Sequence, residues 1–373
     1  MTQSISTLIE QVTSLAQRIG RPVKYMEVCG THTVSLFRSG VRSMLPFGLK
    51  LVSGPGCPVC VTAQRHIDAA IELATNKQVI IATYGDMLRV PGRRGSLERL
   101  RAEGARVEIV NSASSALSLA RSHPADEVVF LAVGFETTAP ATAVVVQEAD
   151  REKVANFSVL MCHKRVVPAM LALLADGKSA LDGFLCPGHV SVIIGSAAYQ
   201  PVVTRHNAPC VVAGFEPLQM LMGIRRLLQQ TLDGQARLEN VYPACVSSAG
   251  NTAAQMLMRK VFRVEDAPWR ALGTIRGSGF ALAPRFAQFD AMSRFGIILG
   301  ADADHPDCRC GEVIQGRAEP ADCPLFDRAC TPMSPVGPCM VSSEGTCAAW
   351  HRYQRSSPHQ RQNQRREFVS CPR

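Results

Sequence analysis

Short, almost entirely apolar segments alternate with stretches of helical periodicity along the first part of the chain, and this alternation restricts the fold more than any other feature. The apolar segments are LKLVSG (49–54), QVIIATYG (78–85), RVEIVNS (106–112) and EVVFLAVGF (127–135). The helical stretches between them cover residues 62–75, 96–104 and 115–123. Strands that are apolar on both faces are typical of a parallel sheet with helices on each side. The order therefore predicts a doubly wound α/β domain over residues 1–150, which includes an N-terminal helix.

The same alternation returns in a second, shorter round. Its predicted strands are FSVLMCHK (157–164), GFLCPG (183–188) and PCVVAGF (209–215), and its helices cover 167–176 and 216–234. This round predicts a second α/β domain over residues 151–235. From residue 236 the pattern loosens, with more Pro, Gly and Cys, which predicts a smaller, irregular C-terminal domain over 236–353. The expected architecture is thus two doubly wound, parallel-sheet (Rossmann-like) domains followed by an irregular one.

Charge and hydropathy exclude several partners. The net charge is +9, but the segment from Arg352 onward contains six Arg and one Glu, so much of the charge lies in a basic tail (354–373) that we expect to be disordered. A basic stripe with interleaved aromatic residues is missing elsewhere, so we expect no nucleic-acid partner. No apolar run approaches the ~20 residues that cross a bilayer, and the N-terminus has no secretory pattern. We therefore expect a cytoplasmic protein without a membrane partner.

Cysteines are unusually concentrated near the C-terminus. Of the fourteen in the chain, six lie between residues 308 and 347: Cys308, Cys310, Cys323, Cys330, Cys339 and Cys347. A reducing compartment makes structural disulfides an unfavourable use for them. The last four are separated by gaps too wide for the paired knuckles of structural zinc sites, and no C-x3-C-x2-C motif is present. Four soft ligands on Pro-rich backbone favour a [4Fe–4S] cluster over zinc or unligated thiols, and Cys308 or Cys310 could replace one of the four.

The remaining unusual motifs follow predicted strands. They are GPGCPVC (54–60), TYGDM (83–87), GFETTAP (134–140), CPGHV (186–190) and GFEP (214–217), with MEVCGTHT (26–33) in another non-helical stretch. Ligands of open parallel sheets bind at the carboxyl ends of the strands, so these motifs should converge on a cleft. The segment DGKS (176–179) lacks the first glycine of a P-loop, and no G-x-G-x-x-G follows a strand. An ATPase or a dinucleotide enzyme is therefore disfavoured.

Two cysteines in GPGCPVC have two possible uses. Cys57 and Cys60 form a C-x-x-C at a predicted helix start, where the helix dipole lowers a thiol pKa and favours a reversible disulfide. A dithiol on the same chain as an iron–sulfur cluster would suit the passage of electrons. The alternative is a second metal knuckle completed by Cys29 and His32.

Other titratable side chains divide into functional and structural candidates. We expect functional roles for His189, beside Cys186 in a Gly/Pro turn, and for Glu136 and Glu216, each after a Gly-Phe at a strand end. Cys162, Cys210 and Cys245 are expected in the core. His163 is undecided, and surface positions are expected for His66, His123, His206, His305, His351 and His359.

Seven motifs together resemble one known family. They are MEVCGTHT, SGPGCPVC, TYGDMLRVPG, GFETTAP, CPGHVSVIIG, VVAGFEPLQML and CPLFDRACTPMSPVGPCMVSSEGTCAAW. In this order, from residue 5 to 353, the sequence resembles the HypD family of [NiFe]-hydrogenase maturation proteins. The basic tail lies outside the resemblance.

The resemblance implies a redox-active assembly scaffold rather than a conventional turnover enzyme. On such a scaffold, iron acquires two cyanides and one carbon monoxide, with a HypC-type chaperone as partner and a HypE-type protein as transient cyanide donor. Cys29 would hold the Fe(CN)2CO unit, and Cys57 and Cys60 would be the redox-active pair. The implied ligands of the [4Fe–4S] cluster are Cys323, Cys330, Cys339 and Cys347. The residues implied to line the cleft are His32, Thr33, Glu136, Thr137, Cys186 and His189.

Two other classes of function stay open on the sequence alone. One is an iron–sulfur thiol–disulfide oxidoreductase of the ferredoxin–thioredoxin reductase type, in which the cluster reduces Cys57 and Cys60. The other is a zinc-stabilised interaction module without redox chemistry.

Overall fold

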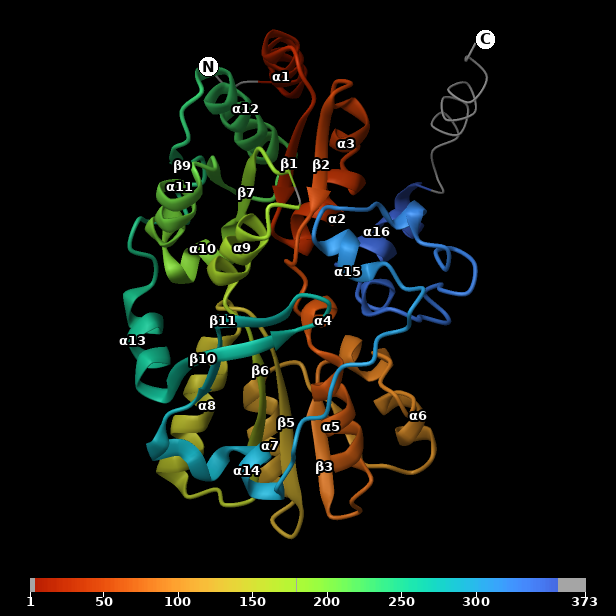
Figure 1. The fold of residues 1–373 in the computed structure, drawn as a ribbon. Coiled ribbons are helices and arrows are strands. Elements are labelled where there is room, and N and C mark those ends of the chain that lie inside the picture. Colours follow the sequence, from red (N-terminus) through yellow and green to blue (C-terminus); the bar gives the residue numbers. More distant parts are fainter. Residues whose placement is uncertain (1–3, 179, 355–373) are drawn as a thin grey trace.

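Two parallel sheets stacked end to end form the framework of the chain (Figure 1). The computed structural model describes residues 4–178 and 180–354. The first sheet has five strands in the spatial order β2 (Leu49–Ser53), β1 (Val23–Glu27), β7 (Gly183–Pro187), β8 (Cys210–Ala213) and β9 (Leu238–Asn240). The second has four, in the order β4 (Val107–Ile109), β3 (Val79–Thr83), β5 (Glu127–Gly134) and β6 (Phe157–His163). Every pairing within these two sheets is parallel.

Helices cover both faces of each sheet, as a doubly wound α/β fold requires. One face of the five-stranded sheet packs on α1 (Ile5–Ile19), α2 (Gly30–Arg38) and α12 (Pro217–Asp233). The other faces α9 (Val166–Ala175), α10 (Gly188–Ile194) and α11 (Gln200–His206). One face of the four-stranded sheet packs on α7 (Ala113–Ser122) and α8 (Ala139–Glu152). Its other face packs on α5 (Gln64–Ala74) and α6 (Leu97–Ala102). The mixed α/β class with parallel sheets is confirmed.

Local sequence explains where these elements begin and end. In α1 the buried residues Leu8, Val12 and Leu15 recur at helical spacing. Ser4 caps its first turn by accepting a hydrogen bond from the Thr7 amide, and Gly20 ends it with a φ of 69°. The helix therefore has the limits that its sequence predicts.

The grouping of strands differs from the sequence expectation. The N-terminal strands β1 and β2 pair with β7–β9 rather than with β3–β5, and β6 joins β5. The chain thus contributes β1 and β2 to the five-stranded sheet, then forms the four-stranded sheet with β3–β6, and then adds β7–β9 to the five-stranded sheet. Strand β1 escaped prediction because its sequence VKYME is not a continuous apolar run, although Glu27 within it is fully buried. Because β1 was not predicted, the sequence contained no sign that the N-terminal strands share a sheet with β7.

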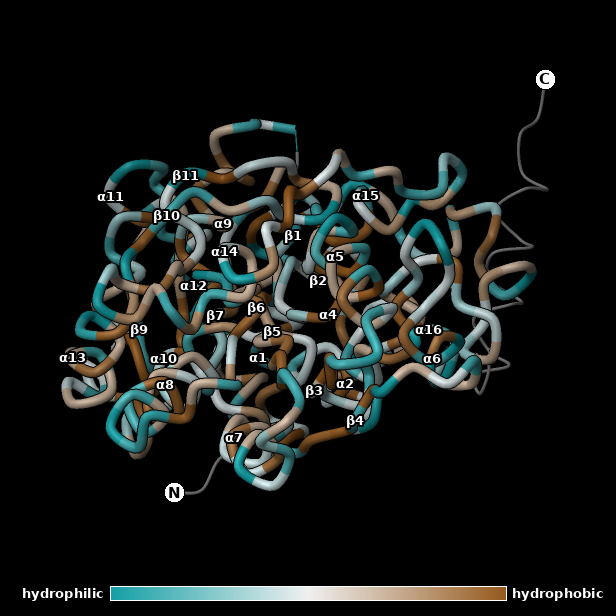
Figure 2. Tube along the Cα trace, turned by 90° about the horizontal axis from the view of Figure 1, so that it is seen from below, coloured by the Kyte–Doolittle hydropathy of each residue, from teal (hydrophilic) through white to brown (hydrophobic). Residues whose placement is uncertain are grey.

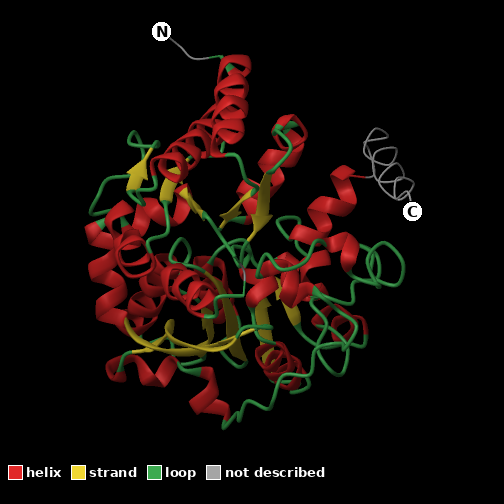
Figure 3. Cartoon of the chain, turned by 45° about the horizontal axis from the view of Figure 1, so that its top comes forward, coloured by secondary structure: helices red, strands yellow, loops and turns green. Residues whose placement is uncertain are grey.

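An antiparallel hairpin and an irregular segment complete the fold. The hairpin β10 (Phe262–Trp269) and β11 (Gly273–Leu282) was not predicted, because Arg263, Glu265 and Asp266 interrupt the apolar residues of β10. Helix α13 (Thr252–Val261) precedes it, and η3 (Pro284–Phe289) and α14 (Ala291–Phe295) follow. Residues 308–354, which we call the cysteine module, contain α15 (Cys310–Ile314), η4 (Pro320–Asp322), η5 (Pro338–Met340) and α16 (Thr346–Gln354). Figure 3 shows that most of this region is loop.

One apolar core runs continuously between the two sheets and into the cysteine module. It includes Val52 and Phe184 of the first sheet, Ile81 and Leu131 of the second, and Met340 of the module. In Figure 2 the apolar colour accordingly gathers on strands near the middle of the molecule, such as β5–β7, and the hydrophilic colour on outer loops. Among the residues that the structure describes, no helix combines the length and the hydropathy needed to cross a membrane.

Candidate functional site

Each parallel sheet has one point where the strand order reverses, and the two points face one cavity. The reversal lies between β1 and β7 in the five-stranded sheet and between β3 and β5 in the four-stranded sheet. The cavity, of about 580 Å³, is lined by Cys29 after β1, His189 after β7, Tyr84 after β3 and Thr137 after β5. Ligands of open α/β sheets bind at such reversals. We call this space the switch-point cavity.

Cys29 lies at the start of α2 with its side chain partly exposed to this cavity. Its backbone is extended, with φ of −159° and ψ of 126°, so it forms the N-cap of the helix. Burial raises the pKa of the Cys29 thiol to about 11, and the nearby Glu344 carboxylate adds to the rise, while hydrogen bonds from His32 and Thr31 oppose it. In the metal-free protein Cys29 is therefore a neutral thiol at neutral pH, and a bound cation would favour the thiolate.

The GPGCPVC loop lies directly against Cys29. A Cβ on Gly56 would come within 2.4 Å of the Cys29 amide nitrogen, so only glycine permits this approach. Cys57 forms the N-cap of the four-residue helix α4 (Pro58–Val61), and its sulfur accepts a hydrogen bond from the Cys60 amide at 3.4 Å. Both side chains are buried, with 5% and 1% of their surface exposed. The dithiol is thus held next to the cavity but shielded from solvent.

Cys60 connects this dithiol to the cysteine module. Its thiol lies beside those of Cys339 and Cys57, and burial together with these neighbours raises its pKa well above the usual range. Cys339 in turn lies beside Cys310 and Cys347. A continuous set of sulfur contacts therefore leads from the loop beside Cys29 into the module.

All six clustered cysteines line one small cavity within the module. They are Cys308, Cys310, Cys323, Cys330, Cys339 and Cys347. The four cysteines that the sequence suggests as cluster ligands thus lie together, and Cys308 and Cys310 lie with them. Across 4–178 and 180–354, no three or more Cys, His, Asp or Glu side chains are already spaced to hold a metal ion. The donors available are thiols alone, which is the chemistry that an iron–sulfur cluster uses.

Two histidines flank Phe215 near the cavity. The rings of His32 and His189 lie 4.7 Å and 3.9 Å from the Phe215 ring. His32 is fully buried and hydrogen-bonds through Nε2 to the Gly214 carbonyl at 2.9 Å. Burial lowers the pKa of His32 to about 4 and also lowers that of His189. His189 is exposed and lines the cavity, whereas His32 anchors the loop that carries Phe215.

A buried polar network lies behind Cys29. Thr33 hydrogen-bonds through its hydroxyl to Ser53 at 3.1 Å, and Ser53 donates to Glu27 at 2.8 Å. The Thr33 hydroxyl also donates to the Cys29 carbonyl at 3.4 Å. Burial raises the pKa of Glu27, while the Arg42 charge opposes the rise. The sequence analysis missed Glu27, because its strand was not predicted. The feature that could have pointed to it is a carboxylate only two residues before Cys29.

Three predicted site residues point elsewhere. Both oxygens of the buried Glu136 carboxylate accept from the Val166 amide, at 3.1 and 3.2 Å, and Glu136 lines a separate cavity of about 1000 Å³. Burial raises its pKa to about 7. Cys186 is fully buried and hydrogen-bonds with Cys210. Glu216 is the N-cap of α12 and forms a capping box with Gln219, which accounts for a carboxylate there.

Glu344 is a site residue that the sequence did not single out. It lies in the turn before Cys347, and its Oε1 accepts a hydrogen bond from the Thr31 hydroxyl at 2.7 Å. A Cβ on Gly30 would come within 2.5 Å of the Glu344 carbonyl, so the two backbones are in close contact. Glu344 also lines the switch-point cavity. It is one direct contact between the cysteine module and the Cys29 loop. The signal in the sequence was an acidic residue between two proposed ligands.

Two structural predictions were wrong. His66, expected on the surface, is buried at 6% exposure on the inner face of α5, where burial lowers its pKa to about 3. Cys245, expected in the core, is exposed. Helical periodicity over residues 62–75 could have placed His66 beside Ile67 and Ala70. The tail beyond residue 354, with His359, lies outside the described residues.

Together, the fold and the site define a thiol-rich α/β protein in which a cavity-facing cysteine is connected by a dithiol to a cluster of cysteines. Comparison with known proteins then narrows this class. The family model for HypD, described as the hydrogenase formation hypA family, matches residues 3–354. The chain belongs to the HypD family of hydrogenase maturation factors, and the resemblance seen in its motifs is confirmed.

The similar proteins come from distant organisms. The hydrogenase maturation factor HypD of Escherichia coli K12 is 44% identical over 352 residues, 94% of both chains. The hydrogenase expression/formation protein HupD of Azotobacter chroococcum is 45% identical over 342 residues, 90% of both chains. A putative hydrogenase expression/formation protein of Methanocaldococcus jannaschii is 42% identical over 351 residues, 94% of this chain and 97% of its own.

Proposed function

We propose that this chain is the scaffold on which the Fe(CN)2CO unit of the [NiFe]-hydrogenase active site is assembled. The observation that carries the proposal is that the loop of Cys57 and Cys60 packs against the backbone of the cavity-facing Cys29, while Cys60 lies beside Cys339 among the six clustered cysteines. Such an arrangement provides one sulfur to hold the iron cargo and others to supply electrons. A HypC-type chaperone would provide a second anchor, and a HypE-type protein would deliver cyanide transiently.

The switch-point cavity suits an iron cargo with diatomic ligands. Cys29 offers a soft sulfur donor to low-spin iron. Most of the cavity's lining is apolar, which limits the access of water: Val28, Val59, Met87, Val133, Phe135, Val166, Val190 and Ile193. His189 and Glu344 are the polar groups beside Cys29 that could meet a ligand or a partner residue. The cargo would thus bind at the apolar junction of the two sheets.

The cysteine module suits a resident [4Fe–4S] cluster held by Cys323, Cys330, Cys339 and Cys347. When bound, such a cluster supplies or accepts single electrons. Cys57 and Cys60 can exchange two: as they form a disulfide, the pair releases two electrons and two protons, and its reduction reverses this. The proximity of Cys60 to Cys339 would give electrons a direct path between the dithiol and the module.

The test separates cargo binding from cluster binding. The full chain is purified without oxygen together with its HypC-type partner, and iron, acid-labile sulfide and the infrared bands of bound cyanide and carbon monoxide are measured. Cys29→Ala should lose the infrared bands while keeping iron and sulfide of the cluster. Cys323→Ala should lose most iron and sulfide. Cys245→Ala, which changes an exposed cysteine outside this arrangement, is the matched control and should keep both. Infrared bands retained on Cys29→Ala would refute the assigned anchor.

The contact between Cys60 and Cys339 also favours a second function. A cluster that reduces the Cys57–Cys60 disulfide for a protein substrate would be a thiol–disulfide oxidoreductase of the ferredoxin–thioredoxin reductase type. Steady disulfide reduction by protein that contains the cluster but no cyanide-bearing iron would support it. If no disulfide reduction is detected and the infrared bands depend on Cys29, the oxidoreductase function is excluded and the scaffold function is supported.

A further inference from the structure

Arg270 is a buried cation in the turn of the β10–β11 hairpin, and its neighbours come from cysteine-bearing elements. Only 4% of its surface is exposed. Its amide donates to the Val61 carbonyl at 2.9 Å, and the adjacent Trp269 pairs with Thr62 as an isolated bridge. Val61 is the last residue of α4, which carries Cys60. One side of the turn is therefore attached to the helix of the dithiol.

The other side of the same turn is attached to α15, which begins at Cys310. Gln315 donates through Nε2 to the Ala271 carbonyl at 3.0 Å. A Cβ on Gly311 would come within 2.4 Å of the Ala271 side chain, so glycine permits close packing at the residue after Cys310. The turn is thus fixed between two helices that each present a cysteine, and the position of Arg270 is fixed with it.

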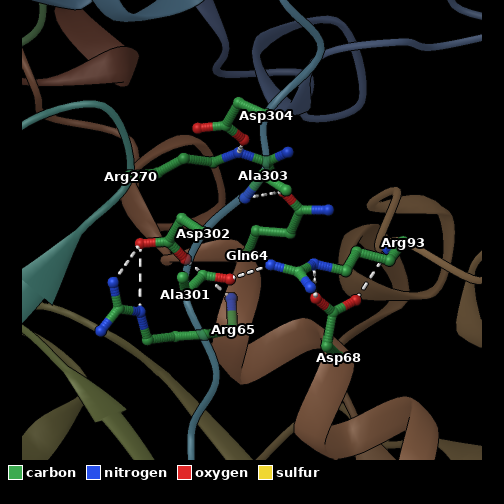
Figure 4. Close-up of polar contacts among 9 residues, drawn as sticks. All are labelled: Gln64, Arg65, Asp68, Arg93, Arg270, Ala301, Asp302, Ala303 and Asp304. Carbon is green, nitrogen blue, oxygen red and sulfur yellow. Dashed lines mark hydrogen bonds and ion pairs between the residues drawn. The ribbon is translucent and has the colours of Figure 1, made fainter.

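The Arg270 guanidinium is paired at one end and unsatisfied at the other. Nε donates to Asp304 Oδ1 at 2.6 Å. Figure 4 shows that Asp304 belongs to the segment 301–304, which crosses α5 and is held there by Gln64, Arg65 and Arg93. Nη1, by contrast, is buried without an acceptor among the described residues. A buried donor without an acceptor is costly, and more so when it is charged, so a negatively charged partner is expected near Nη1.

Three cysteines share a cavity with Arg270, and two of them, Cys308 and Cys310, also line the small cavity of the proposed cluster ligands. Arg270 lines a cavity of about 240 Å³ together with Cys60, Cys308 and Cys310. The hydrogen bond with Cys310 and burial raise the pKa of Cys308, and the Arg270 charge opposes that rise, as expected for a guanidinium close to the sulfur. Other charged or titratable groups around the cavity are Asp304, His305, Glu312 and Arg317. Glu312 is paired with Arg309, and Arg317 with Asp176 at 3.9 Å, so these charges are partly compensated.

We infer that Arg270 is the internal counter-ion of the cysteine-bound cluster and raises its reduction potential. The inference rests on the proposed function, in which thiolates of the module hold a [4Fe–4S] cluster. A cluster with thiolate ligands is an anion, and the one-electron reduction adds a further negative charge. A buried positive charge stabilises the reduced form more than the oxidised form, because Coulomb energies are large where water is excluded. Asp304 opposes this effect, since it places a carboxylate on the same guanidinium.

Variants of opposite sign test the assignment. The full chain is prepared without oxygen, its iron and sulfide are measured, and the cluster is titrated with dithionite while its absorbance or electron paramagnetic resonance is followed. Arg270→Gln should shift the potential to more negative values, and Arg270→Lys, which keeps the charge, should shift it less. Asp304→Asn should shift it to more positive values. Arg276→Gln removes the same charge from an exposed position on the same hairpin and should leave the potential unchanged.

The outcomes separate this inference from the proposed function. If wild type contains no iron and sulfide, the proposed cluster is absent and the inference falls with it. If the cluster is present but Arg270→Gln gives the same potential as Arg276→Gln, the inference alone is overturned. Should Arg270→Gln not fold, as judged by circular dichroism, Asp304→Asn decides: an unchanged or more negative potential overturns the inference, and a more positive one supports it.

Discussion

The switch-point cavity and the cysteine module are built by different physical means. Cys29, Tyr84, Thr137 and His189 each follow a strand of a parallel sheet, so the ladders of backbone hydrogen bonds fix their relative positions. The six cysteines of the module lie on short helices, 3-10 turns and loops, so no ladder of strand hydrogen bonds fixes their relative positions. The cavity should therefore keep its shape without metal, whereas the module should depend on what the sulfurs bind.

Removal of iron from the proposed cluster gives the largest expected difference between the two regions. Chelation of iron from oxygen-free protein should destabilise the module by several kcal/mol, because metal binding to thiolates contributes directly to folding. Amides of residues 323–347 should then exchange with deuterium much faster, while those of β1, β5 and β7 keep their protection. Hydrogen exchange followed by mass spectrometry measures both regions in one sample. Equal loss of protection in the module and in these strands would contradict the distinction.

Ionisation of Glu136 should give the next largest change in the free energy of unfolding. This carboxyl follows strand β5, so the change concerns the sheets rather than the cysteine module. The pKa of this carboxyl is about 7 in the folded chain, raised by burial from an ordinary value of 4.5. Between these two pH values the folded state retains a proton that the unfolded state releases, so the free energy of unfolding falls as pH rises, by ~3 kcal/mol in all. Glu136→Gln lacks this ionisation and should gain about that much relative to wild type between pH 4.5 and 7.

Chemical denaturation of wild type and Glu136→Gln at both pH values checks this. At pH 4.5 the folded wild type carries a neutral carboxyl at position 136, and the variant carries a neutral amide whose oxygen can also accept from the Val166 amide. The two proteins should therefore be close in stability at the lower pH and diverge as pH rises. A difference in unfolding free energy that stays constant over the interval would show that Glu136 is not protonated in the fold.

The sequence allowed the strands and helices of the framework to be predicted where they are apolar and regular. Strands β2 to β8 each coincide with a predicted apolar segment, and α12 with the predicted amphipathic helix. The sheet to which each strand belongs could not be predicted, because β1 is short and partly polar and pairs with the distant β7, as Tyr25 does with Gly183. Local patterns contain no information on such distant pairing.

The site was predictable to the extent that residue type and motif determine it. Cys29 and His189 line the same cavity, as the rule on strand ends suggests, and the loop of Cys57 and Cys60 packs against the Cys29 backbone. Glu344 and Arg270 were missed, because their importance comes from contacts that tertiary folding creates: one with the Cys29 loop, the other with two cysteine-bearing helices. Glu136 and Glu216 illustrate the opposite case, in which a strand-end carboxylate satisfies helix-terminal amides.

A smaller effect is expected where the dithiol loop meets Cys29. Gly56→Ala places a Cβ 2.4 Å from backbone atoms of Val28 and Cys29, which cannot move without distorting β1. The variant should lose ~2 kcal/mol of stability, within the usual range for overpacking. Gly54→Ala is the matched control in the same loop, because its Cβ would meet the flexible Met26 side chain at 2.6 Å and should cost less. Thermal unfolding of the two variants under identical conditions measures the difference in stability. A larger loss for Gly54→Ala would contradict the prediction, because it would show that the loop moves to make room for the Cβ at position 56.

The smallest expected effect lies at the hydrogen bond between Thr31 and Glu344, one of the contacts between the cysteine module and the loop after Cys29. Thr31→Val removes the hydroxyl that donates to Glu344 at 2.7 Å and should cost ~1 kcal/mol, whereas Thr31→Ser keeps a donor and should cost less. Because Glu344 is close in sequence to Cys347, the loss should appear as faster hydrogen exchange in the turn at residues 342–346 and leave β1 unchanged. Equal exchange in this turn for the Val and Ser variants would mean that the other contacts, such as the backbone packing of Gly30 and the ring contacts of Phe37 with Trp350, hold the turn without this hydrogen bond.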